Sequence, residues 1–442
     1  MSGWRSCLRW IGLWALLFLA PAPAQQAPRA LTILHINDLH ARLLPDGRQQ
    51  GGFAHLATVI RRERSGCDSC LLLNGGDLVQ GSPVSTLFRG LPVFEVANRL
   101  GFDAFTLGNH EFDYGWQMIP EFVRKARFPV ISANVEDAGG RLLAPRAYLI
   151  RTVNGIRVAL IGALTADLPD LSMPDLLGPW RASPVVEAVK RSAAEVRDRS
   201  DLVVVVAHIN PQEEDQILRQ VPEVAVVVSG HVHRGLESPK SVDGRVAVRA
   251  KAYGEELGRL DLQLDPAARK LVSFSWKRIP IDARTIPPAP DVARLVKRWE
   301  AKVSKIVDVT IGEARREFAG KDLEILIEKA MAEETGADLA FMNTGGIRDF
   351  LPRGRLLARH VWNVMPFDNR IVVGRFKGSK LPQLITEGAS IDPDREYTLA
   401  VNDFTAANQG VELHVEGLQF STTGPLHRDL MISWIKKKKV LE

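Results

Sequence analysis

The sequence predicts an α/β protein, in which a layered α/β domain with helices on both faces precedes a smaller α+β domain. The N-terminal half repeats one pattern, a short apolar run of strand length that ends abruptly in a polar or glycine-containing loop. Continuously apolar strands are typical of sheets that helices cover on both faces. Near residue 282 the pattern stops at a proline-rich stretch, which indicates a stiff linker between two domains.

The elements of the first domain, residues 30–282, follow this pattern in order. We expect strands at residues 31–36, 71–73, 104–107, 158–161, 202–207 and 224–228. Helix-like stretches at residues 53–64, 84–100 and 185–197 lie between several of them. A strand, a helix and a further strand in succession form the crossovers that build a layered α/β domain.

The second domain, residues 307–442, mixes its elements differently. Residues 283–306 are expected to form the linker and a connecting amphipathic helix at 292–306. A helix at 322–334 should end at Gly336, because glycine favours the conformation that closes a helix. Strands are predicted at 339–342, 370–373, 397–401 and the alternating stretch 411–420, before a closing helix at 425–435.

The first residues indicate the compartment. Arg5 and Arg9 precede an apolar run at 10–20, which is shorter than the ~20 residues that cross a bilayer. Small residues at Ala22 and Ala24 then precede Gln25, so residues 1–24 read as a cleavable signal peptide. The alternative is an uncleaved membrane anchor. We therefore expect a periplasmic or secreted protein without stable membrane insertion after cleavage.

Charge and cysteine content narrow the class of partner. The net charge of +5 falls to about +3 without Arg5 and Arg9, too small an excess to argue for a nucleic acid polymer. Cys67 and Cys70 remain after signal cleavage. In an oxidising compartment a local disulfide is favoured over a redox motif or half of a zinc site, because there is no second cysteine pair.

Candidate metal ligands follow five of the predicted strands. The carboxyl ends of strands are where α/β sheets build binding sites. The candidates, in chain order, are Asp38, His40, Asp77, Asn109, His208, His231 and His233, with His110 and Asp113 next to Asn109. Each motif alone is weak, since a histidine at a strand end is often a structural hydrogen-bonding residue, but their joint placement favours a metal site.

The types of ligand indicate the chemistry. Carboxylates, imidazoles and one amide, without sulfur, suit divalent Mn, Zn, Co, Fe or Mg ions. Seven ligands are too many for one ion but fit two divalent metal ions that share one carboxylate. Two ions ~3.5–4 Å apart clamp a phosphorus centre for in-line displacement. The identity of the metals is left open.

These motifs carry a family resemblance. Their order, Asp-x-His, Gly-Gly-Asp, Gly-Asn-His-Glu, His and Gly-His-x-His, is similar to that of the calcineurin-like metallophosphoesterase superfamily. Residues 109–113, Asn-His-Glu-Phe-Asp, resemble its 5′-nucleotidase family. In the second domain, residues 343–348 (Asn-Thr-Gly-Gly-Ile-Arg), 366–369 (Pro-Phe-Asp-Asn) and 402–404 (Asn-Asp-Phe) match further family segments.

The resemblance implies a role for each candidate residue. One metal would be held by Asp38, His40, Asp77 and His233, and the other by Asp77, Asn109, His208 and His231, with Asp77 bridging. His110 and Asp113 would form the catalytic dyad. The C-terminal substrate-binding domain would contact the nucleoside through Asn343, Gly346 and Arg348, while Phe367 and Phe404 stack on the base.

Two departures from the family pattern concern specificity. The family usually follows Asn-Asp-Phe with Gly-Gly-Asp-Gly, whose Asp holds the ribose hydroxyls, whereas residues 405–410 here read Thr-Ala-Ala-Asn-Gln-Gly. The segment at 381–397 is also shorter than in typical relatives. We therefore expect little discrimination between ribose and 2′-deoxyribose substrates.

The expected function is hydrolysis of a small nucleotide phosphate ester by metal-activated water, most simply as a 5′-nucleotidase. The altered stretch at 405–410 keeps a 2′,3′-cyclic-nucleotide phosphodiesterase or a less specific phosphomonoesterase open as alternatives. A metal-dependent binding protein without turnover is disfavoured by the intact pair of His110 and Asp113. Neither the physiological substrate nor the oligomeric state follows from the sequence.

Overall fold

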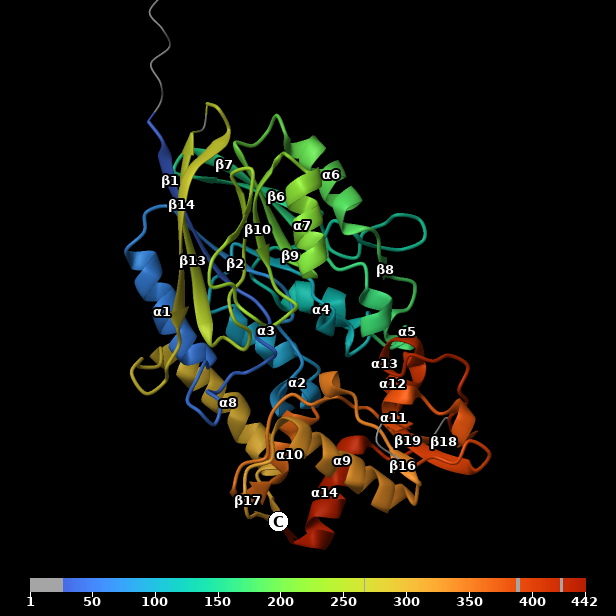
Figure 1. Cartoon of the computed structure of the whole chain (residues 1–442). Helices are drawn as coiled ribbons and strands as arrows, with labels where there is room; N and C mark the ends of the chain where they lie inside the picture. The colour runs from blue at the N-terminus through green and yellow to red at the C-terminus, as the bar shows by residue number, and fades with distance from the viewer. Residues whose placement is uncertain (1–26, 266, 387–389, 422–423) are drawn as a thin grey trace, which may run out of the picture.

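A computed structural model describes residues 27–265, 267–386, 390–421 and 424–442. The predicted signal peptide at 1–24 lies outside these residues. Two parts follow one another along the chain, with the N-terminal part at the top of Figure 1 and the C-terminal part below it. The helix α8 (Pro290–Val307) runs between them.

Two six-stranded sheets form the N-terminal part (Figure 1). The first has the order β14 (Lys270–Pro280), β13 (Glu256–Asp265), β1 (Arg29–Ile36), β2 (Cys70–Asn74), β3 (Ala104–Thr106) and β4 (Val130–Ile131). The second has the order β11 (Lys240–Val242), β12 (Arg245–Val248), β10 (Val224–Ser229), β9 (Leu202–His208), β7 (Ile156–Leu164) and β6 (Tyr148–Val153). The central strands of both sheets are parallel, so their carboxyl ends lie at one edge.

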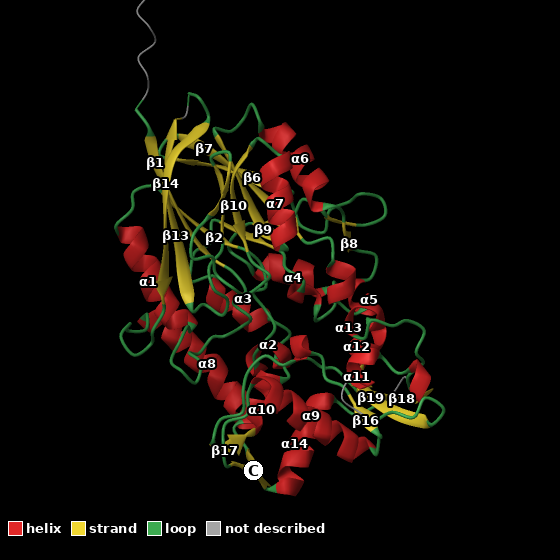
Figure 2. Ribbon diagram, viewed as in Figure 1, coloured by secondary structure: helices red, strands yellow, loops and turns green. Residues whose placement is uncertain are grey.

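The two sheets pack face to face, with helices only on their outer faces (Figure 2). In β1, Ile33 points into the core between the sheets, whereas Leu34 points to the helical layer, because strand side chains alternate between faces. The helices of the first sheet are α1 (Phe53–Ser65), α3 (Leu91–Ala97), α4 (Met118–Lys125) and α8. Those of the second are α6 (Val185–Val196) and α7 (Pro211–Gln220).

The α/β class predicted from the sequence is confirmed, but the order of the layers differs from the expectation. Each sheet has helices on one face and the other sheet on its second face. A strand that is apolar on both sides cannot distinguish these two kinds of cover, because a second sheet excludes water as well as a helix does.

The helix predicted at 84–100 is interrupted. It forms two short helices, α2 (Pro83–Leu87) and α3, on either side of Gly90, which has a φ of 77°. This left-handed conformation ends a helical run and is accessible to glycine without strain. A Cβ atom at this position would lie 2.8 Å from Val79 Cγ1, so close packing also requires glycine here.

Short elements complete the loops of the N-terminal part. They are the strand pair β5 (Val135–Glu136) and β8 (Arg181–Ala182), the helix α5 (Pro174–Leu177) and the 3₁₀ turns η1 (His110–Phe112) and η2 (Leu168–Leu171). Cys67 and Cys70 form the predicted disulfide at the start of β2. In the described part of the chain, no helix is long and apolar enough to span a membrane.

The C-terminal part contains two three-stranded sheets and a pair of packed helices, α9 (Gly320–Thr335) and α14 (His427–Lys438). The sheets have the orders β17 (Gly354–Leu357), β15 (Thr310–Ala314), β20 (Val440–Leu441) and β16 (Leu339–Ala340), β19 (Glu396–Asn402), β18 (Ile371–Lys377). As predicted, Gly336 closes α9 in the left-handed conformation. The remaining elements are α10 (Ala358–Val364), α11 (Gln383–Thr386), α12 (Asp403–Ala407), α13 (Gln409–Glu412), η3 (Thr344–Gly346) and η4 (Gly378–Lys380).

The prediction of a strand at residues 411–420 is wrong. The segment begins in α13 and continues without a strand to Phe420. The Gln409 side chain accepts a hydrogen bond from the Leu418 N–H at 2.7 Å and donates one to the Leu418 carbonyl at 3.3 Å. These bonds occupy the backbone groups that a strand would offer to a neighbour, so local side-chain bonding overrides the alternating pattern.

Candidate active site

The seven predicted metal ligands lie at the carboxyl ends of strands from both sheets, where five loops meet. They are Asp38 and His40 after β1, Asp77 after β2, Asn109 after β3, His208 at the end of β9, and His231 and His233 after β10. All except His231 and His233 are almost completely buried. The face-to-face packing of the sheets brings the loops of the two sheets together.

One cluster contains the four residues that were predicted around the first metal. Single ligand atoms of Asp38, His40, Asp77 and His233 all lie within 4.8 Å of one another. The two Nε2 atoms of His40 and His233 are 2.9 Å apart, and His40 Nε2 lies 3.7 Å from Asp77 Oδ2. Two carboxylates and two imidazoles directed at one point are a donor set that suits Mn, Fe, Zn or Co ions.

Of the residues predicted around the second metal, His208 lies next to both Asp77 and Asn109. His208 Nε2 is 3.1 Å from Asp77 Oδ2 and 3.1 Å from Asn109 Oδ1, and the ring centroid of His231 is 4.9 Å from that of His208. His208 Nδ1 lies 2.8 Å from the Gly75 carbonyl, to which it donates. Such a bond orients a ligating imidazole and leaves its other nitrogen for the metal. Asp77 Oδ2 thus faces both clusters, as a bridging carboxylate must.

The backbone at these loops is strained. Five of the seven predicted ligands have left-handed conformations, with φ between 45° and 86°. They are Asp38, His40, Asp77, His231 and His233. A non-glycine residue in this region costs ~1–3 kcal/mol and persists only where its surroundings impose it. Strain concentrated on one set of side chains indicates that their direction matters for binding.

The protonation states fit a metal site. Burial and the charge of Arg348 keep the pKa of His40 well below its usual value and lower that of His233 to about 2. Both imidazoles are therefore neutral, which is the form that coordinates a metal. Burial alone would raise the pKa of Asp77, but His208 and His110 hold it well below its usual value. Asp77 is therefore ionised, which is the form of a carboxylate that coordinates a metal.

His110 and Asp113 form the predicted pair next to the metal ligands. His110 Nδ1 lies 2.7 Å from Asp113 Oδ2, while His110 Nε2 faces Asp77 Oδ2 at 4.0 Å. Burial opposes the charge on His110, but Asp113 and Asp77 outweigh it and raise the pKa of His110. Asp113 and Asp77 thus favour the imidazolium form of His110, whose Nε2–H would point toward the candidate metal centre.

Glu111 is a buried residue for which the sequence predicted no role. Its carboxylate accepts hydrogen bonds from the backbone N–H groups of Asp77 at 3.1 Å, Leu78 at 2.9 Å and Gly108 at 2.6 Å. It therefore ties the loop after β2 to the loop after β3. Its place between His110 and Phe112 in the Asn-His-Glu-Phe-Asp motif was the available signal, but the sequence does not show which N–H groups it reaches.

A cavity of about 670 Å³ lies between the two parts of the chain and opens onto the candidate metal centre. Asn343, Gly346 and Arg348 line it from the η3 loop. Arg348 Nη2 lies 3.3 Å from His40 Nε2, which brings the guanidinium of the second domain to the ligands of the first. The structure thus gathers the predicted substrate-binding residues and metal ligands around one space.

The two predicted stacking residues, Phe367 and Phe404, also line this cavity. The Phe367 ring lies 5.7 Å from the His110 ring. The carbonyl of the preceding Pro366 accepts hydrogen bonds from Gln80 Nε2 at 3.3 Å and Thr86 Oγ1 at 3.0 Å. The segment that carries Phe367 is therefore held by side chains of the first domain.

Several residues that line the cavity carried no signal in the sequence. They are Glu412 of α13 and the segment around α5 with Leu171, Ser172, Met173, Asp175 and Leu176. No motif surrounds them, and they reach the cavity only because the two parts of the chain lie against each other.

Comparisons with known proteins agree with this architecture. The family model of calcineurin-like phosphoesterases matches residues 31–235, and that of the 5′-nucleotidase C-terminal domain matches residues 303–389. The first part of the chain therefore matches the calcineurin-like phosphoesterases, a class of metal-dependent hydrolases. The second part matches the C-terminal domain of 5′-nucleotidases, so both parts of the chain are similar to those of this family.

Individual relatives are similar at moderate identity. Endonuclease YhcR of Bacillus subtilis is 26% identical over 94% of this chain, which spans 40% of that longer protein. The 5′-nucleotidase of Vibrio cholerae is 28% identical over 79% of this chain and 74% of its own length. The crystal structure of a 5′-nucleotidase precursor from Thermus thermophilus shares the fold, with a TM-score of 0.85, 24% identity and coverage of 94% of this chain and 97% of that one.

Proposed function

We propose that the protein hydrolyses nucleotide phosphate esters, most simply nucleoside 5′-monophosphates, with two divalent metal ions. The observation that carries this proposal is one cavity that joins the ligand clusters around Asp77 to Arg348, Phe367 and Phe404. An anionic phosphate and an aromatic base need these two kinds of surface side by side. The sequence matches to 5′-nucleotidases support the same substrate class.

The residues of the first domain would bind the metals and orient the phosphate. One ion would be held by Asp38, His40 and His233. The other ion would be held by Asn109, His208 and His231. Asp77 would bind both ions. Bound divalent ions supply Lewis acidity at the phosphate and lower the pKa of a water molecule for in-line attack. The strained loops keep these side chains directed at one point, which lowers the cost of organising the site when substrate binds.

The His110 and Asp113 pair would act on the reacting phosphate. Asp113 accepts the Nδ1–H of His110 and leaves a proton at Nε2, on the side of Asp77. From there the imidazolium is placed to donate a hydrogen bond to the charge that develops on the phosphate or the leaving oxygen. Groups that act in this way contribute ~10²–10⁴-fold to the rate.

The second domain would bind the rest of the substrate. The fork of Arg348 is suited to a phosphate oxygen pair, and its own carbonyl accepts from Arg42 at 3.1 Å, which anchors this loop to the first domain. Phe367 and Phe404 offer π-faces on which any base can stack, at ~1–3 kcal/mol per base.

The predicted signal peptide would direct export of the protein, so that the reaction takes place in the periplasm or outside the cell. The disulfide between Cys67 and Cys70 is in keeping with an oxidising compartment. Hydrolysis of a small, exported or extracellular nucleotide is the process that we propose, with no role for a nucleic acid polymer.

The test is a substrate panel with the purified mature protein. Release of phosphate from 5′-mononucleotides at rates well above those for sugar phosphates and p-nitrophenyl phosphate is expected. The changed stretch at 405–410 favours a second candidate, and faster hydrolysis of 2′,3′-cyclic nucleotides would support it instead. Comparable rates on all esters would indicate an unspecific phosphomonoesterase. Absence of turnover with every ester, in the presence of Mn²⁺, Zn²⁺, Co²⁺ or Mg²⁺, would refute the proposal.

A further inference from the structure

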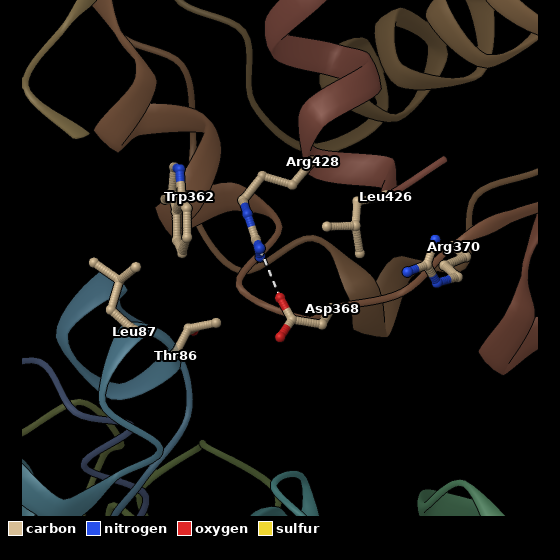
Figure 3. Close-up of a pocket in the computed structure, with 7 residues that line it drawn as sticks. All are labelled: Thr86, Leu87, Trp362, Asp368, Arg370, Leu426 and Arg428. Atoms are coloured by element: carbon tan, nitrogen blue, oxygen red, sulfur yellow. Dashed lines mark hydrogen bonds and ion pairs between the residues drawn. The ribbon is translucent and has the colours of Figure 1, made fainter. Parts of the chain in front are cut away.

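The carboxylates of the cavity differ in how strongly they are engaged. Asp113 is bound to His110, and Asp403 Oδ1 accepts the N–H of Arg370 at 3.0 Å. Asp368 accepts from the buried Arg428 at 2.6 Å, as Figure 3 shows. These three acids are bound to groups of the protein itself, and Asp175, which also lines the cavity, is exposed.

Glu412 is different. It lies in the short helix α13, is partly buried and lines the cavity. Within the described residues, its side-chain hydrogen bond comes from Asn343. Burial raises the pKa of Glu412, against the effects of Asn343 and the nearby His414. A carboxylate with one donor retains acceptor sites, because two oxygens accept about four hydrogen bonds.

Asn343 is oriented toward this carboxylate by its other neighbour. Asn402 Nδ2 donates to Asn343 Oδ1 at 2.8 Å, so the Asn343 NH₂ group is left to donate elsewhere. Asn402 itself is completely buried at the end of β19, where its side-chain oxygen accepts the Thr405 N–H at 2.8 Å and caps α12. The contact between Asn343 and Glu412 therefore rests on a fixed part of the domain.

The η3 loop places opposite charges around the cavity. The Arg348 side chain of this loop contacts His40 of the candidate metal centre, whereas the Asn343 side chain contacts Glu412. A phosphate ester whose phosphate lies on the cationic side presents its leaving group to the rest of the cavity. A leaving group with hydrogen-bond donors satisfies Glu412, while one with a second anion is repelled.

We propose that Glu412 selects the leaving group, by accepting hydrogen bonds from the sugar hydroxyls or the amino group of the base and by repelling leaving groups that carry a second negative charge. This inference rests on the proposed nucleotide hydrolysis. Recognition of the sugar hydroxyls would replace the expectation of little sugar discrimination, since the chain has a carboxylate two residues beyond the 405–410 stretch.

The test compares kcat/KM for four 5′-phosphates: those of adenosine, 2′-deoxyadenosine and inosine, and adenosine 3′,5′-bisphosphate. Wild type should prefer adenosine monophosphate over the analogue that lacks the recognised donor by about tenfold to a hundredfold, the range of a charge-assisted hydrogen bond. A preference against the deoxy compound identifies the sugar hydroxyls, and one against the inosine compound identifies the amino group. The bisphosphate should be a poor substrate.

Two variants and a control complete the experiment. Glu412→Gln should reduce the preference to within about threefold and improve the bisphosphate relative to adenosine monophosphate, because the charge is lost. Glu412→Asp should restore part of both effects. Glu416→Gln removes an equal charge from an exposed position of the same segment outside the cavity lining, and should keep the wild-type ratios.

The failures of the two proposals are distinguishable. If wild type hydrolyses the nucleotides without preference, or Glu412→Gln retains the full preference, the role of Glu412 is refuted and the nucleotidase proposal stands. If no ester is hydrolysed, the function itself fails. Competition by adenosine, 2′-deoxyadenosine and inosine for wild-type binding provides the same comparison without any variant, and equal affinities of all three would again overturn the role of Glu412.

Discussion

Replacing Glu111 by Gln tests how the candidate metal loops are held together. Glu111 Oε1 accepts the N–H groups of Leu78 and Val79, at 2.9 and 3.3 Å, and Oε2 accepts those of Asp77 and Gly108, at 3.1 and 2.6 Å. An amide keeps one accepting oxygen, so two buried N–H groups lose their acceptor and meet an NH₂ group instead. At ~1–3 kcal/mol for each unsatisfied group, Glu111→Gln should cost ~2–6 kcal/mol.

The assay is thermal unfolding with and without a chelator. One kcal/mol shifts the melting temperature of a domain of 150–250 residues by ~2–4 °C, so a decrease of about 4–24 °C is expected. Because the effect lies in the loops themselves, it should persist in the chelator, and the metal content before chelation should also fall. Glu121→Gln, at a more exposed acid of α4, is the matched control. A melting temperature within 2 °C of wild type in the chelator would show that Glu111 does not hold these loops.

Four further perturbations test other parts of the site and the fold. Asp77→Ala should lower the content of both metals and abolish turnover, because the Asp77 carboxylate faces both ligand clusters; two bound metals with normal turnover, measured by elemental analysis and phosphate release, would contradict this. His110→Asn should lower kcat by ~10²–10⁴ while metal content stays at the wild-type value, whereas joint loss would make His110 a ligand. Phe404→Ala should weaken nucleotide binding by ~1–3 kcal/mol relative to p-nitrophenyl phosphate, which lacks a base, and an equal loss for both substrates would indicate core packing. Burial lowers the pKa of His427 to about 4, whereas the usual pKa of a histidine is ~6.5. Below pH 6.5 the unfolded chain therefore binds a proton at His427 that the folded chain excludes. The free energy of unfolding should fall by up to about 3 kcal/mol between pH 6.5 and pH 4. His427→Leu should reduce this dependence in thermal unfolding, and an unchanged slope would show that other groups cause it.

The location of the candidate site followed from the sequence because its signal is local. Five loops, those after β1, β2, β3, β9 and β10, begin where an apolar run stops. The residues that follow within each loop are of the types that bind metals. Parallel strands present their carboxyl ends at one edge, so proximity could be inferred without coordinates. The distances around Asp77 agree with that inference, while metal binding itself stays a prediction.

Other features depend on contacts between distant segments. The pairing of the two sheets could not be distinguished from a helical cover, because both bury an apolar strand face equally. The strand predicted at 411–420 failed because the Gln409 side chain bonds the backbone of Leu418, which no hydrophobic pattern records. Likewise, Glu111 is informative only once its carboxylate is seen against the N–H groups of two loops.

The sequence by itself determined the α/β class, the order of the two domains and the set of candidate ligands, and it favoured the disulfide that the structure shows. These follow from residue type, spacing and hydrophobic period, which act over a few positions. The tertiary structure alone decided the sandwich of two sheets, the contact of Arg348 with His40 and the entry of Glu412 into the cavity. Such contacts join residues hundreds of positions apart, and they depend on how whole elements pack against one another.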